Sequence, residues 1–179
     1  VMGIFIYNLK EKKIFISYVI TAILTIEVYA VLNEALQMIN TGGFIEGGNL
    51  KGVTANRNIT AFSIAIKIPF VLFIIYKLSN YLIKIGLSGL LLLSILCLSM
   101  IQSRASFIAL AFIFFAFLAL CIALFLNDRN KFSLYLFTYF FVPMFLAVGI
   151  NQFFLSDKGA DALARASTIS IGTNDGSVN

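Results

Sequence analysis

The chain of 179 residues is 60% hydrophobic and only 12% charged, with a mean hydropathy of +0.98. Because about 25% of the residues in a soluble domain are charged, this composition excludes a soluble domain and indicates an integral membrane protein. The net charge of +5 is then explained by Lys and Arg flanking transmembrane helices on the cytoplasmic side, so we expect no nucleic-acid partner. We predict an all-α, polytopic transmembrane helix bundle.

Five apolar stretches are each long enough to cross a bilayer, since about 17 to 25 apolar residues span its hydrocarbon core. Residues 1–7 are apolar but shorter, and we expect them to end a preceding helix. The complete spans are predicted at 14–32, 59–76, 81–101, 105–126 and 132–155. A polar, glycine-rich connection at 34–58 separates the first two. We therefore expect an incomplete domain, with a transmembrane region at 1–155 and the start of a periplasmic loop at 156–179.

The distribution of Lys and Arg predicts the orientation of these spans. With the turn after residue 7 in the cytoplasm, seven of these residues lie on the cytoplasmic side and five on the opposite side. The seven lie in very short loops, where the positive-inside rule counts most. The glycine-rich connection, the turn at Arg104 and the C-terminal segment then share the outer side.

Two arginines are predicted at this outer surface, because Arg57 precedes the second span and Arg104 precedes the fourth. The polar residues beside them are Asn56, Asn58, Ser103 and Ser106. Paired guanidinium N–H donors match phosphate oxygens, so these residues form a candidate diphosphate-binding site. Alternatively, Arg104 is an ordinary interfacial side chain, and Asn58 is the N-cap of the second helix.

Glu27 and Lys67 are predicted inside the hydrocarbon, about 7.5 Å and 12 Å from the outer ends of their helices. An ionised group there costs about 2.5 to 3.5 kcal/mol and usually faces a partner or a wet cavity. Their similar depths predict an ion pair. An intramembrane relay in a transporter or channel subunit is the alternative. The sequence contains no histidine, and neither cysteine has metal-ligand spacing, so we expect no metal site.

Three short motifs stand in a fixed order between the predicted spans. Residues 52–61 read Gly-Val-Thr-Ala-Asn-Arg-Asn-Ile-Thr-Ala, residues 103–106 read Ser-Arg-Ala-Ser, and residues 174–177 read Asn-Asp-Gly-Ser. This order resembles the O-antigen ligase and polymerase family of polytopic bacterial membrane glycosyltransferases. Members of that family typically show a Gly-x-x-x-Asn-x-Asn loop and a Ser-Arg-Gly/Ala turn.

The resemblance implies an enzyme of the bacterial inner membrane. It would take a glycan from undecaprenyl diphosphate on the periplasmic side and pass it to lipid A-core or another glycan acceptor, with no cofactor. Arg104 matches the turn arginine of the family, which binds the diphosphate, whereas many members have another residue at the position of Arg57. The family's histidine base lies in the periplasmic region beyond these residues, so the resemblance places no catalytic residue in this sequence. A polysaccharide polymerase and a protein O-oligosaccharyltransferase share the fold.

Overall fold

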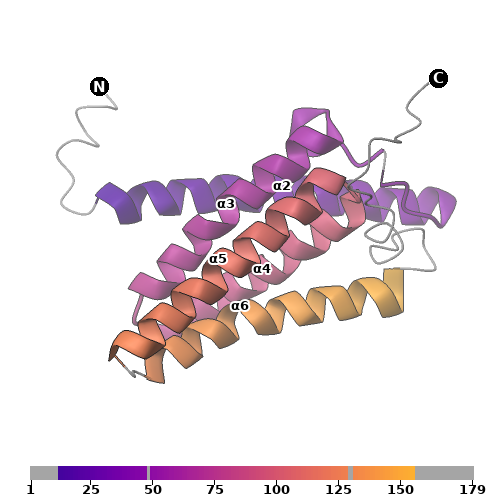
Figure 1. Cartoon of the computed structure of the whole chain (residues 1–179). Coiled ribbons are helices and arrows are strands. Elements are labelled where there is room, and N and C mark those ends of the chain that lie inside the picture. Colours follow the sequence, from indigo (N-terminus) through magenta and orange to yellow (C-terminus); the bar gives the residue numbers. More distant parts are fainter. Residues whose placement is uncertain (1–11, 48, 129–130, 156–179) are drawn as a thin grey trace, which may run out of the picture.

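A computed structural model describes residues 12–47, 49–128 and 131–155, and these residues form a bundle of α-helices without a strand (Figure 1). The long helices are α2 (Lys12–Gly42), α3 (Arg57–Lys77), α4 (Tyr81–Ile101), α5 (Arg104–Asp128) and α6 (Lys131–Ile150). A 3₁₀ turn, η1 (Gly52–Thr54), precedes α3, and a π-helical turn, η2 (Asn151–Leu155), follows α6. The all-α prediction is confirmed. The preceding helix expected at 1–7 and the loop expected at 156–179 lie outside the described residues.

Four helical stretches in the described part of the chain are long and apolar enough to cross a membrane: Lys12–Gly42, Arg57–Lys77, Tyr81–Ile101 and Phe137–Leu155. The remaining predicted span forms α5, a helix of 25 residues whose apolar part is described over Phe107–Ala123. The span predicted at 132–155 is not one regular helix, because its last five residues widen into the π-helical turn η2.

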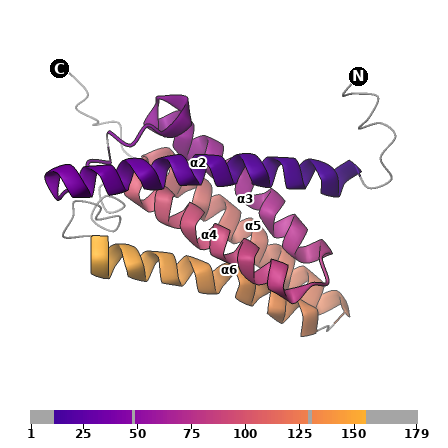
Figure 2. The ribbon, with the colours of Figure 1, turned by 180° about the vertical axis from the view of Figure 1, so that it is seen from behind.

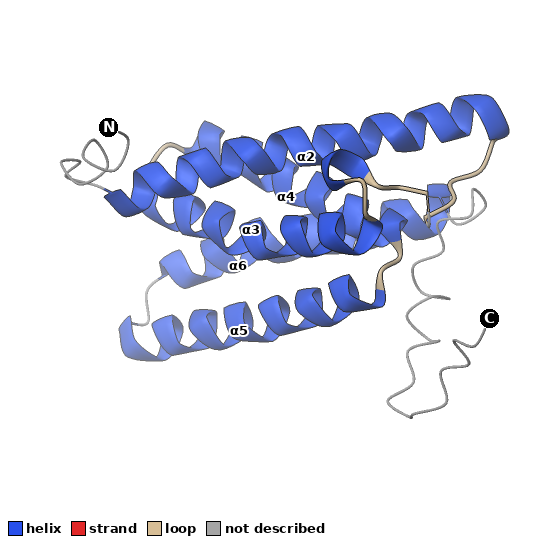
Figure 3. Ribbon diagram, turned by 90° about the horizontal axis from the view of Figure 1, so that it is seen from above, coloured by secondary structure: helices blue, strands red, loops and turns tan. Residues whose placement is uncertain are grey.

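Short connections make α3, α4, α5 and α6 alternate in direction (Figures 1 and 2). As a result, α3 and α5 begin where α4 and α6 end, and we call this the arginine end because Arg57 and Arg104 begin the two helices. The opposite end, where α3 finishes at Lys77, is called the lysine end. Viewed from above, α2 and α5 lie on opposite sides of the bundle, with α3, α4 and α6 between them (Figure 3).

The interior and the exterior of the bundle are both apolar. Residues such as Leu24, Ile68 and Leu91 are completely buried between the helices. Large and mainly apolar side chains, including Tyr29 (71% exposed) and Phe112 (75% exposed), cover the outside. An exposed apolar surface of this extent is expected where lipid replaces water as the solvent, because lipid tails are as apolar as leucine.

Helix α2 is longer than predicted, since it continues through ten residues beyond Leu32 that we expected to be part of a loop. The polar residues Asn33 and Glu34 led to the wrong boundary. They do not end the helix because the stretch that follows is rich in strong helix formers, and no glycine or proline occurs before Gly42. Helix α2 therefore extends past the start of α3 at the arginine end.

Candidate functional site

A hydrogen bond between distant segments organises the arginine end. The hydroxyl of Ser103 donates to Oδ1 of Asn58 over 3.0 Å, which ties the first turn of α3 to the connection between α4 and α5. Arg57 directly precedes one partner, and Arg104 directly follows the other. Both arginines are partly exposed. The structure therefore brings Asn58, Ser103 and the two arginines to one hydrogen-bonded junction, while the side chain of Ser106 lies outside the described ones.

The turn that carries Arg104 is very tight. Only Gln102 and Ser103 separate the end of α4 from the start of α5, and Gln102 adopts the left-handed backbone conformation with φ of 54°. The carbonyl of Ser103 then accepts from the amide of Phe107, which closes the first turn of α5. The backbone that carries Arg104 is thus held in place by both helices.

Asn56, another predicted binding residue, has a structural role in this arrangement. Its Oδ1 accepts from the amides of Asn58 at 3.0 Å and Ile59 at 3.4 Å, so Asn56 is the N-cap of α3. The prediction that Asn58 is the N-cap is wrong. The helix begins one residue after Asn56 because its side chain satisfies two amides of the first turn. The side chain of Asn58 is left for the bond to Ser103.

The glycine-rich connection packs against the arginine end instead of projecting from it. At Gly47 an added Cβ would lie 2.6 Å from the carbonyl oxygen of Met100, so only glycine allows this approach to α4. Gly52, with φ of 56°, turns the chain against Thr60. The Glu34 carboxylate accepts from the amides of Lys51 and Gly52, each over 2.9 Å.

The sequence analysis missed this fastening of the connection to the bundle. The two apolar residues that bury it, Ile45 and Leu50, are 2% and 0% exposed. The cluster of glycines was the available signal, since glycine permits both close approach and positive φ. The packed connection is therefore part of the arginine end.

A second polar cluster lies between α2 and α3. Lys67 Nζ is 2.9 Å from Glu27 Oε1 and 2.8 Å from Oε2, and these side chains are only 14% and 9% exposed. The hydroxyl of Ser63, a residue that the sequence analysis did not select, donates to Glu27 Oε1 over 2.8 Å and also contacts Lys67. Its position four residues before Lys67 is the signal that could have identified it, because such residues share a helix face.

The predicted depth of Glu27 is wrong, because α2 ends later than expected. Glu27 lies 15 residues before Gly42 rather than about five residues from a helix end. Lys67 lies 10 residues after Arg57, or about 15 Å along α3. The ion pair is therefore near the middle of α3 and is separate from the arginine end.

The two arginines give the arginine end donors for an anion. Helices α3 and α5 begin there next to Arg57 and Arg104, but α4 and α6 end at the same place, so the partial charges of the helix termini offset one another. Guanidinium groups bind phosphate in proteins, whereas the amides of Asn58 and Ile59 at the start of α3 are already bonded to Asn56. No group of three His, Cys, Asp or Glu side chains suited to a metal ion occurs in the part of the chain that the structure describes.

Comparisons with protein-family models, with curated proteins and with solved structures found no match to this chain.

Proposed function

We propose that this protein is a membrane glycosyltransferase that binds a glycan linked to a polyprenyl diphosphate at the arginine end. In the form that the motifs favour, it acts in the bacterial inner membrane and transfers the glycan from undecaprenyl diphosphate to lipid A-core, as an O-antigen ligase does. The observation that carries this proposal is the Ser103–Asn58 hydrogen bond, which joins the Asn-Arg-Asn and Ser-Arg motifs at one surface of the bundle.

The chemistry of transfer requires the features found at this surface. When the acceptor hydroxyl attacks the first sugar, it gives its proton to a base, which the resemblance places beyond these residues. The bond between the sugar and the diphosphate breaks, and negative charge grows on a phosphate oxygen. Preorganised positive groups that face this oxygen lower the barrier without a metal ion. Arg104 is assigned to the leaving phosphate, and Arg57 supplies additional positive potential. In this proposal the Glu27–Lys67 pair holds α2 on α3.

Arg104→Lys tests the assignment, because it keeps the charge and removes the planar fork of donors. Losing one hydrogen bond to a charged group costs about 1.5 to 3 kcal/mol, so we expect glycan transfer to fall by roughly 10- to 150-fold. Surface polysaccharide is measured in cells that carry the variant on an otherwise unchanged gene. Lys13→Arg, which keeps a charge at the exposed start of α2, is the control. Normal polysaccharide with an unchanged amount of Arg104→Lys protein contradicts the assignment.

A deletion strain identifies the acceptor class. Accumulation of long glycan chains on the carrier supports a ligase. Accumulation of single repeats indicates a polymerase, and loss of glycans from secreted or surface proteins indicates a protein O-oligosaccharyltransferase. An unchanged glycan profile in the deletion strain contradicts the proposal as a whole.

A further inference from the structure

An apolar groove of about 470 Å³ runs between α3 and α5. Its walls include Pro69, Phe73 and Tyr76 of α3 and Phe112, Ala116 and Leu120 of α5. The two helices run in the same direction, and the groove occupies the half of α3 that leads to the lysine end. Its volume lies within the range of about 300 to 1,000 Å³ that is common for small-molecule sites.

The shape of the groove follows from the side chains that line it. Ala116 contributes only a methyl group at a position flanked by the larger Phe112 and Leu120, and the ring of Pro69 stays close to the backbone of α3. The side chains that line an unfilled groove lack partner atoms on one side and so lose dispersion energy. A flexible hydrocarbon chain fills such a space without leaving a polar group unpaired.

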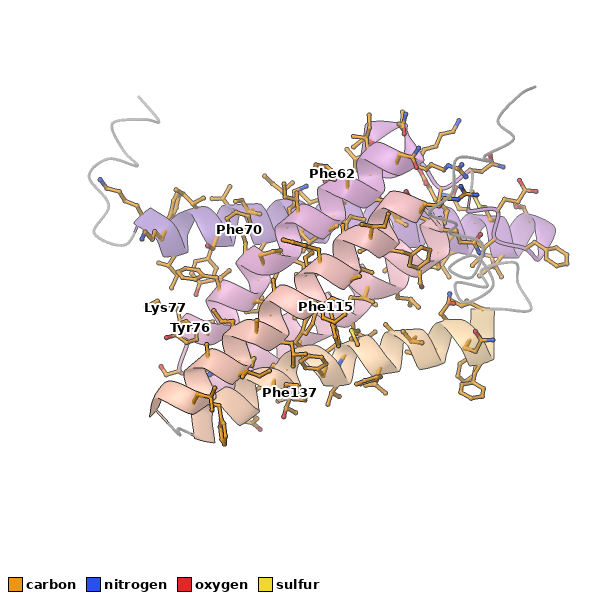
Figure 4. All side chains as sticks on the ribbon, in the orientation of Figure 1. Phe62, Phe70, Tyr76, Lys77, Phe115 and Phe137 are labelled. Atoms are coloured by element: carbon orange, nitrogen blue, oxygen red, sulfur yellow. The ribbon has the colours of Figure 1, made fainter. Side chains whose placement is uncertain are left out.

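A positive charge marks the end of this groove. Lys77 follows the groove residue Tyr76, and its Nζ lies 5.6 Å from the centre of the Tyr76 ring. Lys77 is exposed, and Figure 4 shows it with Tyr76 at the lysine end, far from Phe62 near the start of α3. Asp128, which ends α5, is eight residues beyond the groove residue Leu120, or about 12 Å along the helix. An anionic headgroup at the mouth of the groove would therefore meet Lys77 first.

We propose that this groove binds one anionic glycerophospholipid, with an acyl chain between α3 and α5 and the phosphate at Lys77. An anionic lipid satisfies both parts of the site. A neutral lipid would make no ion pair with Lys77, and a free anion would leave the apolar groove empty. The lysine end is the end predicted to be cytoplasmic, and the cytoplasmic leaflet carries a negative surface potential. The phosphate position at Lys77 is a full helix length away from Arg57, and the proposal does not depend on glycan transfer.

Native mass spectrometry of the full chain in detergent tests the proposal by titration with phosphatidylglycerol or with phosphatidylcholine of the same acyl chains. We expect tighter binding of one phosphatidylglycerol, by about fivefold for the single lysine contact, which corresponds to about 1 kcal/mol. Lys77→Gln should remove this preference, while Lys13→Gln, at an exposed position on α2, should keep it.

A second pair of variants tests the groove itself. Ala116→Phe fills the groove and should abolish binding of phosphatidylglycerol. Ala111→Phe, on the opposite face of α5, should leave this binding unchanged. Equal affinities for the two lipids, or retention of lipid by Ala116→Phe, overturn the proposal. It is also overturned if a polyprenyl phosphate displaces phosphatidylglycerol at equal concentration, or if Ala116→Phe converts a dimer into a monomer, because the groove then holds the carrier or a second copy.

Discussion

Removing one partner of the Glu27–Lys67 pair should destabilise the bundle much more than removing both. In Lys67→Met the carboxylate of Glu27, 9% exposed, keeps only the hydroxyl of Ser63. Two unit charges about 4 Å apart attract each other by about 4 kcal/mol at an effective dielectric constant of 20. Breaking a buried pair from one side typically costs about 3 to 5 kcal/mol. The unfolding equilibrium should therefore shift by roughly 1,000-fold.

The two single variants should differ from each other. In Glu27→Met, Lys67 still donates to the carbonyl of Ser63 over 3.0 Å, and its long side chain can reach toward a more polar region. We therefore expect a smaller loss of stability than in Lys67→Met. The double variant, with methionine at both positions, should be close to the wild type in stability, because no unpaired charge remains.

The reactivity of Cys97 provides the assay. This thiol is completely buried and contacts the carbonyl of Val28 over 3.7 Å, next to Glu27. The only other cysteine is Cys121, so Cys97 can be followed alone in a Cys121→Ser background. The measurement is the SDS concentration, in mixed micelles, at which half of Cys97 reacts with a thiol reagent.

Three results of this assay discriminate between explanations. Lys13→Met, which removes an exposed lysine from α2, should leave the midpoint unchanged and serves as the control. If Lys67→Met also leaves the midpoint unchanged, the pair contributes nothing measurable to the packing of α2. If the double variant loses the sum of the two single losses, the effects do not arise from an unpaired buried charge.

Two further predictions concern the arginine end. Gly47→Ala should lower the free energy of unfolding by about 1 to 3 kcal/mol, because its methyl group meets the backbone of α4, whereas Gly42→Ala, with no atom within 4 Å of the added Cβ, should not. The same thiol assay measures both, and equal stability of the two variants would show that the connection moves away freely. In a cysteine-free background, Asn49→Cys should react with an impermeant maleimide from outside intact cells, and Ser79→Cys should not. The reverse pattern would place the arginine end in the cytoplasm and exclude transfer from a periplasmic carrier.

Hydrophobic length could predict most of the helices, because a bilayer requires a long run of apolar residues and hydrogen-bonded backbone groups within each span. It could not predict where α2 ends. Asn33 and Glu34 are polar, but the carboxylate of Glu34 finds its partners in the amides of Lys51 and Gly52. The helix formers between Glu34 and Gly42 were a local signal for the longer helix, whereas the partner of the Glu34 carboxylate, 17 residues later in the chain, was not readable from local composition.

The candidate site was also predicted only in part from the sequence. The residue types of the Asn-Arg-Asn and Ser-Arg motifs indicated an anion site, but the same letters could not show that Asn56 caps α3 while Asn58 receives the hydroxyl of Ser103. The pairing of Glu27 with Lys67 followed from the high cost of an isolated charge in lipid. The spacing of Ser63 and Lys67 places them on one helix face, but only the crossing of α2 and α3 brings the hydroxyl of Ser63 to Glu27.

By itself, the sequence determined that this is a membrane protein made of helices, because its continuous apolar runs have the length of about 20 residues that a helix needs to cross a bilayer, about twice that of a barrel strand. It also determined that two deeply placed opposite charges need partners. Only the tertiary structure decided which surfaces meet: the junction of Asn58 with Ser103, the approach of Gly47 to α4 and the groove between α3 and α5. In this bundle both the interior and the exterior are apolar, so hydrophobicity distinguishes membrane from water but does not select which helix faces pack together.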